Sequence, residues 1–384
     1  MNTNPPSAVS AEQKDRWLKG IGERLGVLDE HLVRLVKRRI DLSTLVVDTK
    51  GTDPIVVLGR EQSRLQHIGQ VAAEVGIDPY LAQALLHTVI NAGVKHQTML
   101  RDEATSSQEG NNAGDRSPEA LRRNLLRLTE SVAETYDTHQ DGCPATRFTY
   151  QIENRIISET IESLDHRGTF VDLGTATGRM IFHHKAGFRS LVGYDISPAM
   201  VAVAQGKVNS NQRHRIQFVQ RDLEQGIPLE DGTVSFVVMN NGTCGDIVDI
   251  QSLLSEVRRV LTRGGYAYLS FYNADALVHR SILPWQNSIA AIFNPIMNTL
   301  EVDLAGVRGT IPVHARMYSV QEIRDMVERR FALQRLNTFP FVTSLMPREL
   351  FREGFIEPLL NLDMQLCESG DEHGAYVGLV VQKI

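Results

Sequence analysis

The chain has few cysteines and no long apolar run. Its three cysteines, Cys143, Cys244 and Cys367, lie far apart, so we expect neither a disulfide framework nor a metal site. No apolar stretch reaches the roughly 20 residues that span a membrane. The first residues also lack the basic and apolar segments of a secretion signal. We therefore expect a cytoplasmic protein.

A strong charge of one sign is also missing. The formal net charge is −6 over 384 residues, and the basic residues form no patch that would indicate nucleic-acid binding. Hydrophobic residues make up 42% of the chain, which is typical of a globular protein. The length favours two domains over one core. We expect a small-molecule substrate, with no nucleic acid and no membrane as partner.

A small, polar segment at residues 103–118 divides the chain. It has no apolar periodicity, which is typical of a flexible linker. Residues 1–102 have a helical pattern, whereas residues 119–384 alternate between strand and helix patterns. The sequence therefore predicts an α plus α/β protein, in which a three-helix domain precedes a doubly wound, mostly parallel sheet.

The N-terminal part carries an apolar stripe. Its residues step by three and four, which predicts one long helix: Leu18, Ile21, Leu25, Leu28, Leu32 and Leu35. A second helix is predicted from about Arg60, and a third begins at Asp78-Pro79 and runs to about residue 100. Three such helices cannot bury this stripe alone, so we expect a homodimer formed through them.

The C-terminal part predicts alternating elements. Strands are expected at 169–173, 190–195, 216–220, 234–239, 265–272, 332–339 and 375–382. Helices are expected at 198–208, 250–262 and 319–330. Residues 274–315 are longer than a plain crossover, which indicates a cap or lid.

The first of these strands ends in a glycine loop. Residues 169–178 read Thr-Phe-Val-Asp-Leu-Gly-Thr-Ala-Thr-Gly, and glycine allows the backbone to approach a ligand closely. Asp195 ends the second strand and Asp222 the third, at the edge where such sheets bind ligands. Asp195 is placed to accept hydrogen bonds from ribose hydroxyls, and Asp222 is placed to accept one from an adenine amino group. The loop lacks the clean G-x-G-x-x-G of a dinucleotide site, while single glycines and aspartates also serve as turns and helix caps.

This run resembles the class I S-adenosylmethionine-dependent methyltransferases over about residues 119–384. The resemblance rests on the glycine loop, the two aspartates and Gly264-Gly265 ahead of the fifth strand, although the loop's middle glycine is Ala176. It implies S-adenosylmethionine as the cofactor and a Rossmann-like fold. The residues that it assigns to the cofactor are Asp172, Gly174, Thr175, Gly178, Asp195, Ile196, Asp222, Leu223 and Asn240.

Methyl transfer is an in-line displacement that mainly needs positioning in a water-poor pocket. The candidates for shaping the reacting end are Tyr136, Asn241, Tyr272 and His279. Arg147 and Arg316, with Tyr318, are candidates for holding the acceptor, because arginine binds carboxylates through two hydrogen bonds. Each of these residues also has the plain interpretation of an ordinary, partly buried polar side chain.

A second candidate site lies in the helical part. Arg39 falls on the apolar stripe, where an unpaired charge would be costly. Lys50 lies near the same helix face. Together with Gln97, these cations would suit a small dicarboxylate.

Residues 13–100 resemble the all-helical chorismate mutases. The resemblance implies that Arg39, Lys50 and Arg60 bind the substrate carboxylates and ether oxygen. It also implies that Glu61 accepts a hydrogen bond from a substrate hydroxyl and that Gln97 reaches the ether oxygen. It also implies electrostatic catalysis without a covalent step. The sequence departs from that family at three positions: Gly22, Val57 and Gly93.

The expected function is methylation of a small, carboxylate-bearing metabolite, such as a shikimate-derived aromatic or keto acid of natural-product biosynthesis. One alternative is a cyclase or lyase that consumes S-adenosylmethionine and releases methylthioadenosine. The helical part is either an active mutase, which would make the protein bifunctional, or a dimer scaffold or sensor. The acceptor atom and any lid motion are left open.

Overall fold

The structure is a computed structural model of the chain. It describes residues 116–276, 278, 291–294, 297–303, 310–344 and 356–384, together with most of 18–39 and 58–90. In this part of the chain, no helix is long and apolar enough to cross a membrane.

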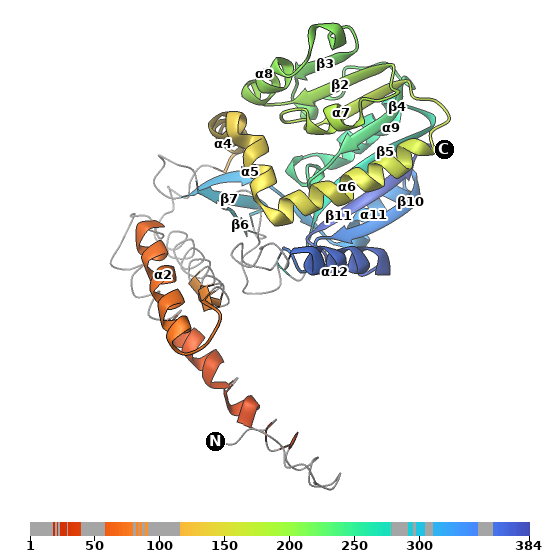
Figure 1. Cartoon of the computed structure of the whole chain (residues 1–384). Coiled ribbons are helices and arrows are strands. Elements are labelled where there is room, and N and C mark those ends of the chain that lie inside the picture. The colour runs from red at the N-terminus through yellow and green to blue at the C-terminus, as the bar shows by residue number, and fades with distance from the viewer. Residues whose placement is uncertain are drawn as a thin grey trace.

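A single mixed sheet forms the centre of the C-terminal part (Figure 1). Seven strands follow the order β10-β11-β5-β4-β1-β2-β3, and the short β9 pairs with β5. The strands are β1 Thr169–Leu173, β2 Ser190–Asp195, β3 Ile216–Gln220, β4 Val234–Met239, β5 Leu261–Asn273, β9 Met317–Tyr318, β10 Ala332–Phe339 and β11 Tyr376–Gln382. Strands β3, β2, β1, β4 and β5 are parallel, while β11 is antiparallel to both neighbours. The predicted mostly parallel sheet is confirmed.

The strand predictions agree with the structure at β1, β2, β3, β4 and β10, with the same first and last residues. β5 begins earlier than expected, because Leu261 already pairs with Val234 and the register then shifts. Gly264 adopts a positive φ of 78° within this strand. The early part of β5 is therefore an irregular entrance, which periodicity alone did not predict.

Helices cover both faces of the sheet. They are α4 Pro118–Val132, α5 Tyr136–Gly142, α6 Pro144–Glu162, α7 Arg179–His184, α8 Pro198–Gly206, α9 Ile250–Val260, α11 Val320–Glu328 and α12 Ile356–Ser369. The predicted helices at 198–208 and 250–262 both end two residues early. α9 stops because Leu261 is extended, with ψ of 139°. α11 starts after Ser319, which forms a capping box with Glu322.

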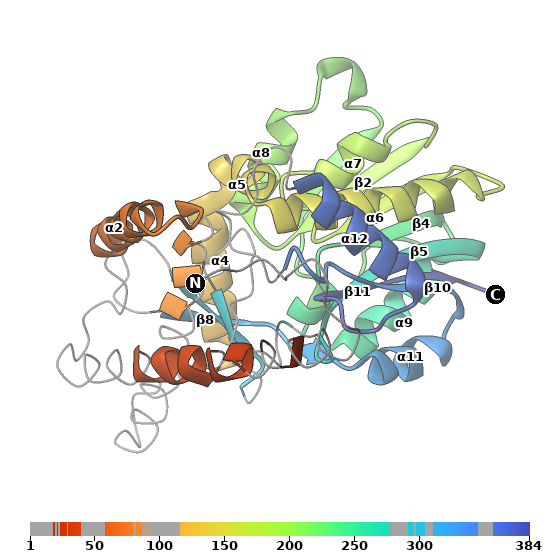
Figure 2. The same cartoon turned by 60° about the horizontal axis from the view of Figure 1, so that its bottom comes forward.

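The core has two layers, one on each side of the sheet. Successive β1 residues alternate between them, since Phe170 packs in one layer and Val171 in the other. Both faces of a parallel sheet are normally buried in this way. α6, α7, α8 and α12 contribute to the first layer, and α9 and α11 to the second. Figure 2 shows α6 and α12 on the opposite side of the strands from α9 and α11.

The segment predicted as a cap or lid contains a small antiparallel sheet. Its strands are β6 Ala291–Asn294, β7 Thr299–Asp303 and β8 Thr310–His314. It contacts α4, because Asn124 Nδ2 in the middle of that helix donates to the carbonyl of Pro312 at 2.8 Å. Arg116 also pairs with the buried Glu301 at 3.1 Å.

The described N-terminal residues are helical where the three helices were expected. The described residues between 18 and 39 are helical, α2 spans Leu58–Glu74, and the described residues between 79 and 90 are helical too. The stripe leucines at 18, 25, 28, 32 and 35 are 50–63% exposed. The apolar stripe is therefore not covered by the part of the chain that the structure describes.

Candidate functional site

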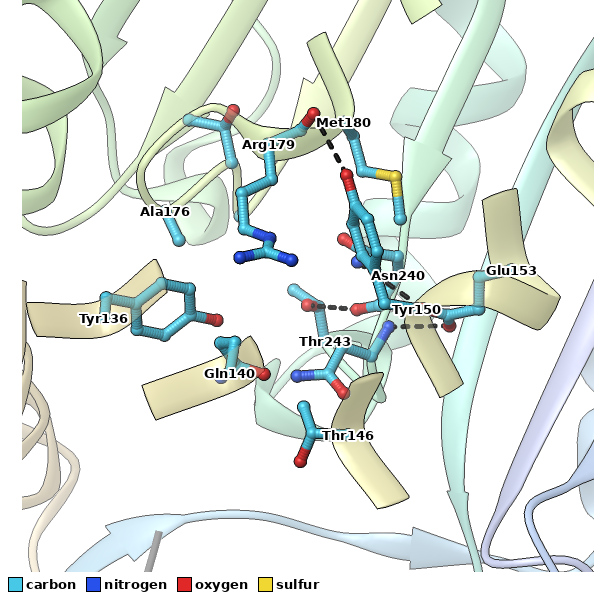
Figure 3. A pocket seen from close by; sticks show the side chains of 13 residues that line it. Tyr136, Gln140, Thr146, Tyr150, Glu153, Ala176, Arg179, Met180, Asn240 and Thr243 are labelled. Carbon is cyan, nitrogen blue, oxygen red and sulfur yellow. Dashed lines mark hydrogen bonds between the residues drawn. The ribbon is translucent and has the colours of Figure 1, made fainter. Parts of the chain in front are cut away.

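A small cavity lies at the carboxyl ends of β1 and β4, where the glycine loop begins (Figure 3). Its volume is about 50 Å³. Its walls come from α5, α6, the loop between β1 and α7, and the turn after β4. We call this cavity the chamber; its lining residues are Tyr136, Gln140, Thr146, Tyr150, Glu153, Gly174, Thr175, Ala176, Arg179, Met180, Asn240, Asn241 and Thr243.

The glycine loop owes its shape to two left-handed glycines. Gly174 has φ of 78° and Gly178 has φ of 83°. A Cβ on Gly178 would lie 2.5 Å from the ring of Phe218, and one on Gly174 would lie 2.5 Å from the methyl group of Thr243. Between them, Ala176 also adopts a positive φ of 45°, which is uncommon for a residue with a side chain. The loop therefore tolerates few other sequences.

Asp195 joins the glycine loop to the end of β2. Its Oδ2 accepts from the backbone N–H of Ala176 at 2.8 Å, and its Oδ1 accepts from that of Ser197 at 2.8 Å. Burial raises the pKa of this carboxyl group. A carboxylate offers about four acceptor positions, so Asp195 keeps acceptor capacity for a ligand hydroxyl. Ile196 follows it, partly buried.

Asp172 is buried below the loop. Its Oδ2 accepts from the Thr175 hydroxyl at 2.6 Å. Its Oδ1 is buried and has no hydrogen-bond partner among the described residues. Burial raises the pKa of this carboxyl group to about 7. Buried polar atoms normally have a partner, so Asp172 offers an acceptor for a donor that the chain itself does not supply.

Asp222 has a capping role in the structure. It is the N-cap of the 3-10 helix Leu223–Gln225 and accepts from the backbone N–H of Glu224 at 3.0 Å. It also pairs with Arg122 of α4 at 3.1 Å. Leu223 is buried in the core. Neither residue is among those that line the chamber, and their cofactor role stays a prediction.

Glu153 is a wholly buried carboxyl group in the chamber wall, and sequence reasoning missed it. Its Oε1 accepts from the backbone N–H of Asn241 at 2.8 Å and from the hydroxyl of Tyr268 at 3.3 Å. The Asn240 amide lies 3.5 Å from its Oε2. Burial raises the pKa of Glu153 to about 7. An acidic residue on the apolar face of a helix was the available signal, because Phe148, Ile152 and Ile156 share that buried face.

Arg179 is a second chamber residue that sequence reasoning missed. It is the first residue of α7, directly after Gly178. Its Nη2 donates to Asp141 at 2.7 Å and its Nη1 to the carbonyl of Asp137 at 3.4 Å. The guanidinium lies 4.4 Å above the ring of Tyr150. Figure 3 shows it reaching into the chamber between the rings of Tyr136 and Tyr150.

Asp137 of α5 also bonds to the glycine loop, beside the contact of Asp141 with Arg179. Asp137 accepts from the Thr177 hydroxyl at 2.6 Å and from Lys207 Nζ at 2.5 Å. Lys207 also donates to the carbonyl of Thr177 at 3.0 Å. Burial alone would raise the pKa of Asp137, but the hydrogen bonds from Lys207 and Thr177 outweigh it and lower the pKa. We call these contacts the Asp137 latch; they hold Tyr136 in the chamber wall.

The structure brings together some of the residues predicted to shape the reacting end. Tyr136 and Asn241 line the chamber, together with Asn240, which the resemblance assigned to the cofactor. Tyr272 is buried just behind it, within hydrogen-bonding reach of Asp246, whose pKa burial raises to about 7. The ring of Tyr272 lies 5.8 Å from the ring of Tyr376. His279 lies outside the described residues.

The residues predicted to hold the acceptor lie elsewhere. Arg147 is on α6 but exposed, and it is not part of the chamber lining. Arg316 and Tyr318 line a separate surface depression beside α11, where the guanidinium lies 4.5 Å above the ring. Their proposed role in acceptor binding remains untested.

The mutase-like residues are described only in part. Arg39 is helical and half-buried, and its Nη1 lies 3.5 Å from the carbonyl of Val89 in the third helical stretch. Arg60 and Glu61 are in the first turn of α2. Lys50 and Gln97 lie outside the described residues, as do the departures at 22, 57 and 93.

Comparison with known families gives a match where the chamber residues are concentrated. A family model described as a methyltransferase domain matches residues 170–265, from β1 into β5. Residues 170–265 are therefore a methyltransferase domain. The match includes the glycine loop, Asp195 and the turn after β4.

Solved structures similar to the chain include two S-adenosylmethionine-dependent methyltransferases. That of Mesorhizobium loti is 15% identical, covers 59% of this chain and 96% of its own, and has a TM-score of 0.37. That of Methanosarcina mazei is 15% identical, covers 59% of this chain and 97% of its own, and has a TM-score of 0.39. The PH0226 protein of Pyrococcus horikoshii is 15% identical, covers 60% of this chain and 88% of its own, and has a TM-score of 0.41. No curated protein matches the sequence.

A methyltransferase domain implies S-adenosylmethionine as the cofactor, and the residues in and beside the chamber fit it. The unpartnered Oδ1 of Asp172 suits a hydrogen-bond donor of the cofactor. Gly174 and Gly178 keep the loop free of side chains that would fill it. In the part of the chain that the structure describes, no cluster of His, Cys, Asp or Glu is able to hold a metal.

Proposed function

We propose that the protein transfers the methyl group of S-adenosylmethionine to a small acceptor that bears a carboxylate. The guanidinium of Arg179 in the chamber is the observation that carries this proposal (Figure 3). It lies between two aromatic rings at the edge of the sheet where ligands bind. A guanidinium has five N–H donors, and the hydrogen bonds to Asp137 and Asp141 leave donors for a ligand.

The chain's own residues then have defined tasks. The cofactor supplies an electrophilic methyl group, and the protein must align an acceptor with it away from water. Tyr136 and Tyr150 enclose the space, and Arg179 orients the acceptor through its carboxylate. Asn240 and Asn241 form the opposite wall, held in place by Glu153.

The experiment that tests this function follows the fate of the cofactor. Purified protein is incubated with methyl-labelled S-adenosylmethionine and a panel of aromatic and keto acids, and the products are identified by mass. Formation of S-adenosylhomocysteine that depends on a carboxylate acceptor supports the proposal. Release of methylthioadenosine without any acceptor would contradict it and favour the cyclase alternative.

Replacement of Arg179 tests the role of its charge. We expect Arg179→Gln to lower kcat/KM for a carboxylate acceptor by roughly 10- to 100-fold, since a charge-assisted hydrogen bond contributes about 1.5–3 kcal/mol. Methyl transfer to the methyl ester of the same acceptor should change little. Arg147→Gln is the matched control, because Arg147 is exposed and lies outside the chamber. Equal losses for the acid and the ester would refute the assigned role.

We further propose that residues 1–102 dimerise the chain as a chorismate-mutase-like helical domain. Support comes from the exposed stripe leucines, five of which are 50–63% exposed in the single chain. Apolar helix faces of this kind are normally buried against partner helices.

Deletion of residues 1–102 is expected to convert a dimer into a monomer while leaving cofactor affinity within about twofold of the full chain. The reason is that the described chamber residues all lie between 136 and 243. Light scattering coupled to size exclusion measures the first property, and calorimetric titration with S-adenosylhomocysteine the second. A deletion variant that stays dimeric would contradict the proposed interface.

Measuring chorismate consumption by the full chain tests whether residues 1–102 are only a scaffold or an active mutase. Formation of prephenate that Arg39→Ala abolishes would make the protein bifunctional. No turnover at high enzyme concentration leaves the helices as a scaffold or sensor.

A further inference from the structure

We propose that Glu153 is the counter-charge for a cationic group of the bound cofactor and that it gives up its proton when that cation binds. Two groups of S-adenosylmethionine carry positive charge, the sulfonium centre and the amino-acid ammonium. The inference rests on the cofactor and is independent of the identity of the acceptor.

The position of Glu153 makes the chamber a site for a cation. The carboxyl group lines the chamber, and none of its side chain is exposed to bulk water. Its contacts are the Asn241 N–H, the Tyr268 hydroxyl, the distant amide of Asn240 and the Ser270 hydroxyl. All of these groups are neutral, and in the described part of the chain Glu153 forms no ion pair. A buried carboxylate of this kind lacks a positive partner, which is costly.

The titratable groups that face Glu153 do not supply that partner. Tyr268 on β5, Tyr376 on β11 and Cys244 in the turn after β4 surround it. All three are neutral at pH 7, because burial raises the pKa of each further above its ordinary value. Arg179 also lines the chamber, but its guanidinium contacts Asp141, Asp137 and the ring of Tyr150, and in the described part of the chain no ion pair joins it to Glu153.

The pH dependence follows from this setting. Burial raises the pKa of Glu153 to about 7, so about half of the carboxyl groups are protonated at neutral pH. A nearby cation favours the ionised form, lowers the pKa and expels the proton. Affinity for the cation is therefore low below the pKa and rises as pH passes through it. Between pH 6 and pH 8 we expect about a tenfold gain in affinity for S-adenosylmethionine.

Calorimetric titration in buffers of different ionisation enthalpy counts the protons released on binding. At pH 7 we expect S-adenosylmethionine to release about half a proton per site. Methylthioadenosine, which has neither cation, should release none. S-adenosylhomocysteine distinguishes the two sources: it retains the ammonium but not the sulfonium, so release with this ligand identifies the ammonium and its absence identifies the sulfonium.

Two variants assign the proton to Glu153 rather than to Asp172 or Asp246, whose pKa values burial also raises to about 7. Glu153→Gln should bind S-adenosylmethionine without that proton release and with affinity that no longer changes between pH 6 and pH 8. Glu159→Gln is the matched control on the same helix, since Glu159 is 45% exposed. It should behave as the native chain does.

Unaltered proton release in Glu153→Gln would overturn the proposal. If that variant does not fold, the native chain still decides, because an affinity that is flat from pH 6 to pH 8 also refutes it. A failure to find a carboxylate acceptor leaves these measurements intact, so the two proposals fail separately.

Discussion

Replacing Asp363 with alanine is expected to lower the free energy of unfolding by about 3–5 kcal/mol, because it leaves several buried donors without an acceptor. Asp363 on α12 is fully buried. Its Oδ1 accepts from the backbone N–H groups of Phe341 and Val342 at 2.9 and 2.6 Å. Its Oδ2 accepts from the N–H of Thr343 at 2.9 Å and also from its hydroxyl. One side chain thus organises the turn that follows β10.

Thermal or denaturant unfolding followed by circular dichroism measures this loss. Glu368→Ala, on the same helix, is the matched control, because its side chain is 50% exposed in a surface ion pair with Arg155. Such pairs contribute about 0–1 kcal/mol. Similar stabilities for the two variants would show that the turn does not depend on Asp363.

Gly178→Ala is expected to weaken binding of S-adenosylmethionine by roughly 100-fold or more. The left-handed φ of 83° disfavours any side chain there, at about 1–2 kcal/mol. The new Cβ would also lie 2.5 Å from the ring of Phe218, so the loop must move. A shifted loop changes the positions of Gly174 and Ala176 and breaks the hydrogen bond from Ala176 to Asp195.

Calorimetric titration with the cofactor measures the effect, with a melting curve to confirm folding. Gly206→Ala is the control, because nothing lies within 4 Å of a Cβ at the end of α8. Native-like affinity in Gly178→Ala would mean that the loop is not the cofactor's contact.

The sheet edge was predictable because its signals are local. Each of β1, β2, β3 and β4 is a short apolar run, and each matched its predicted bounds. Parallel strands place their carboxyl ends together, so Asp172, Asp195 and Asn240 were predicted to lie near one another from sequence order alone. The loop's glycines could be recognised from the sequence, because only glycine fits a left-handed turn beside a bulky ring.

The opposite wall of the chamber was not predictable in the same way. Tyr150 and Glu153 come from α6, whose apolar face packs on the sheet, and an apolar pattern does not reveal which polar residue is enclosed with it. Arg179 was hidden for another reason: a basic residue opening a helix is ordinarily solvated. Its direction depends on contacts with Asp137 and Asp141, about 40 residues earlier in the chain.

The arginines that sequence reasoning favoured illustrate the same limit. Arg147 is on the chamber's own helix but is exposed, about one turn before Tyr150 and nearly two turns before Glu153. Arg316 follows the small sheet and stacks on Tyr318 beside α11. A residue type and an approximate place in the chain predict the chemistry of a contact, whereas helix rotation decides which surface the side chain reaches.

The Asp137 latch has a consequence for the timing of the reaction. The chamber, at about 50 Å³, is smaller than the roughly 300–1,000 Å³ that ligand pockets usually offer. Separation of α5 from the glycine loop would widen the chamber, and it would break the contacts of Asp137 with Thr177 and Lys207 and those of Arg179 with Asp137 and Asp141. The Lys207 pair is 33–38% exposed, so salt weakens it. We therefore expect added salt to loosen α5 from the glycine loop and to speed release of the spent cofactor.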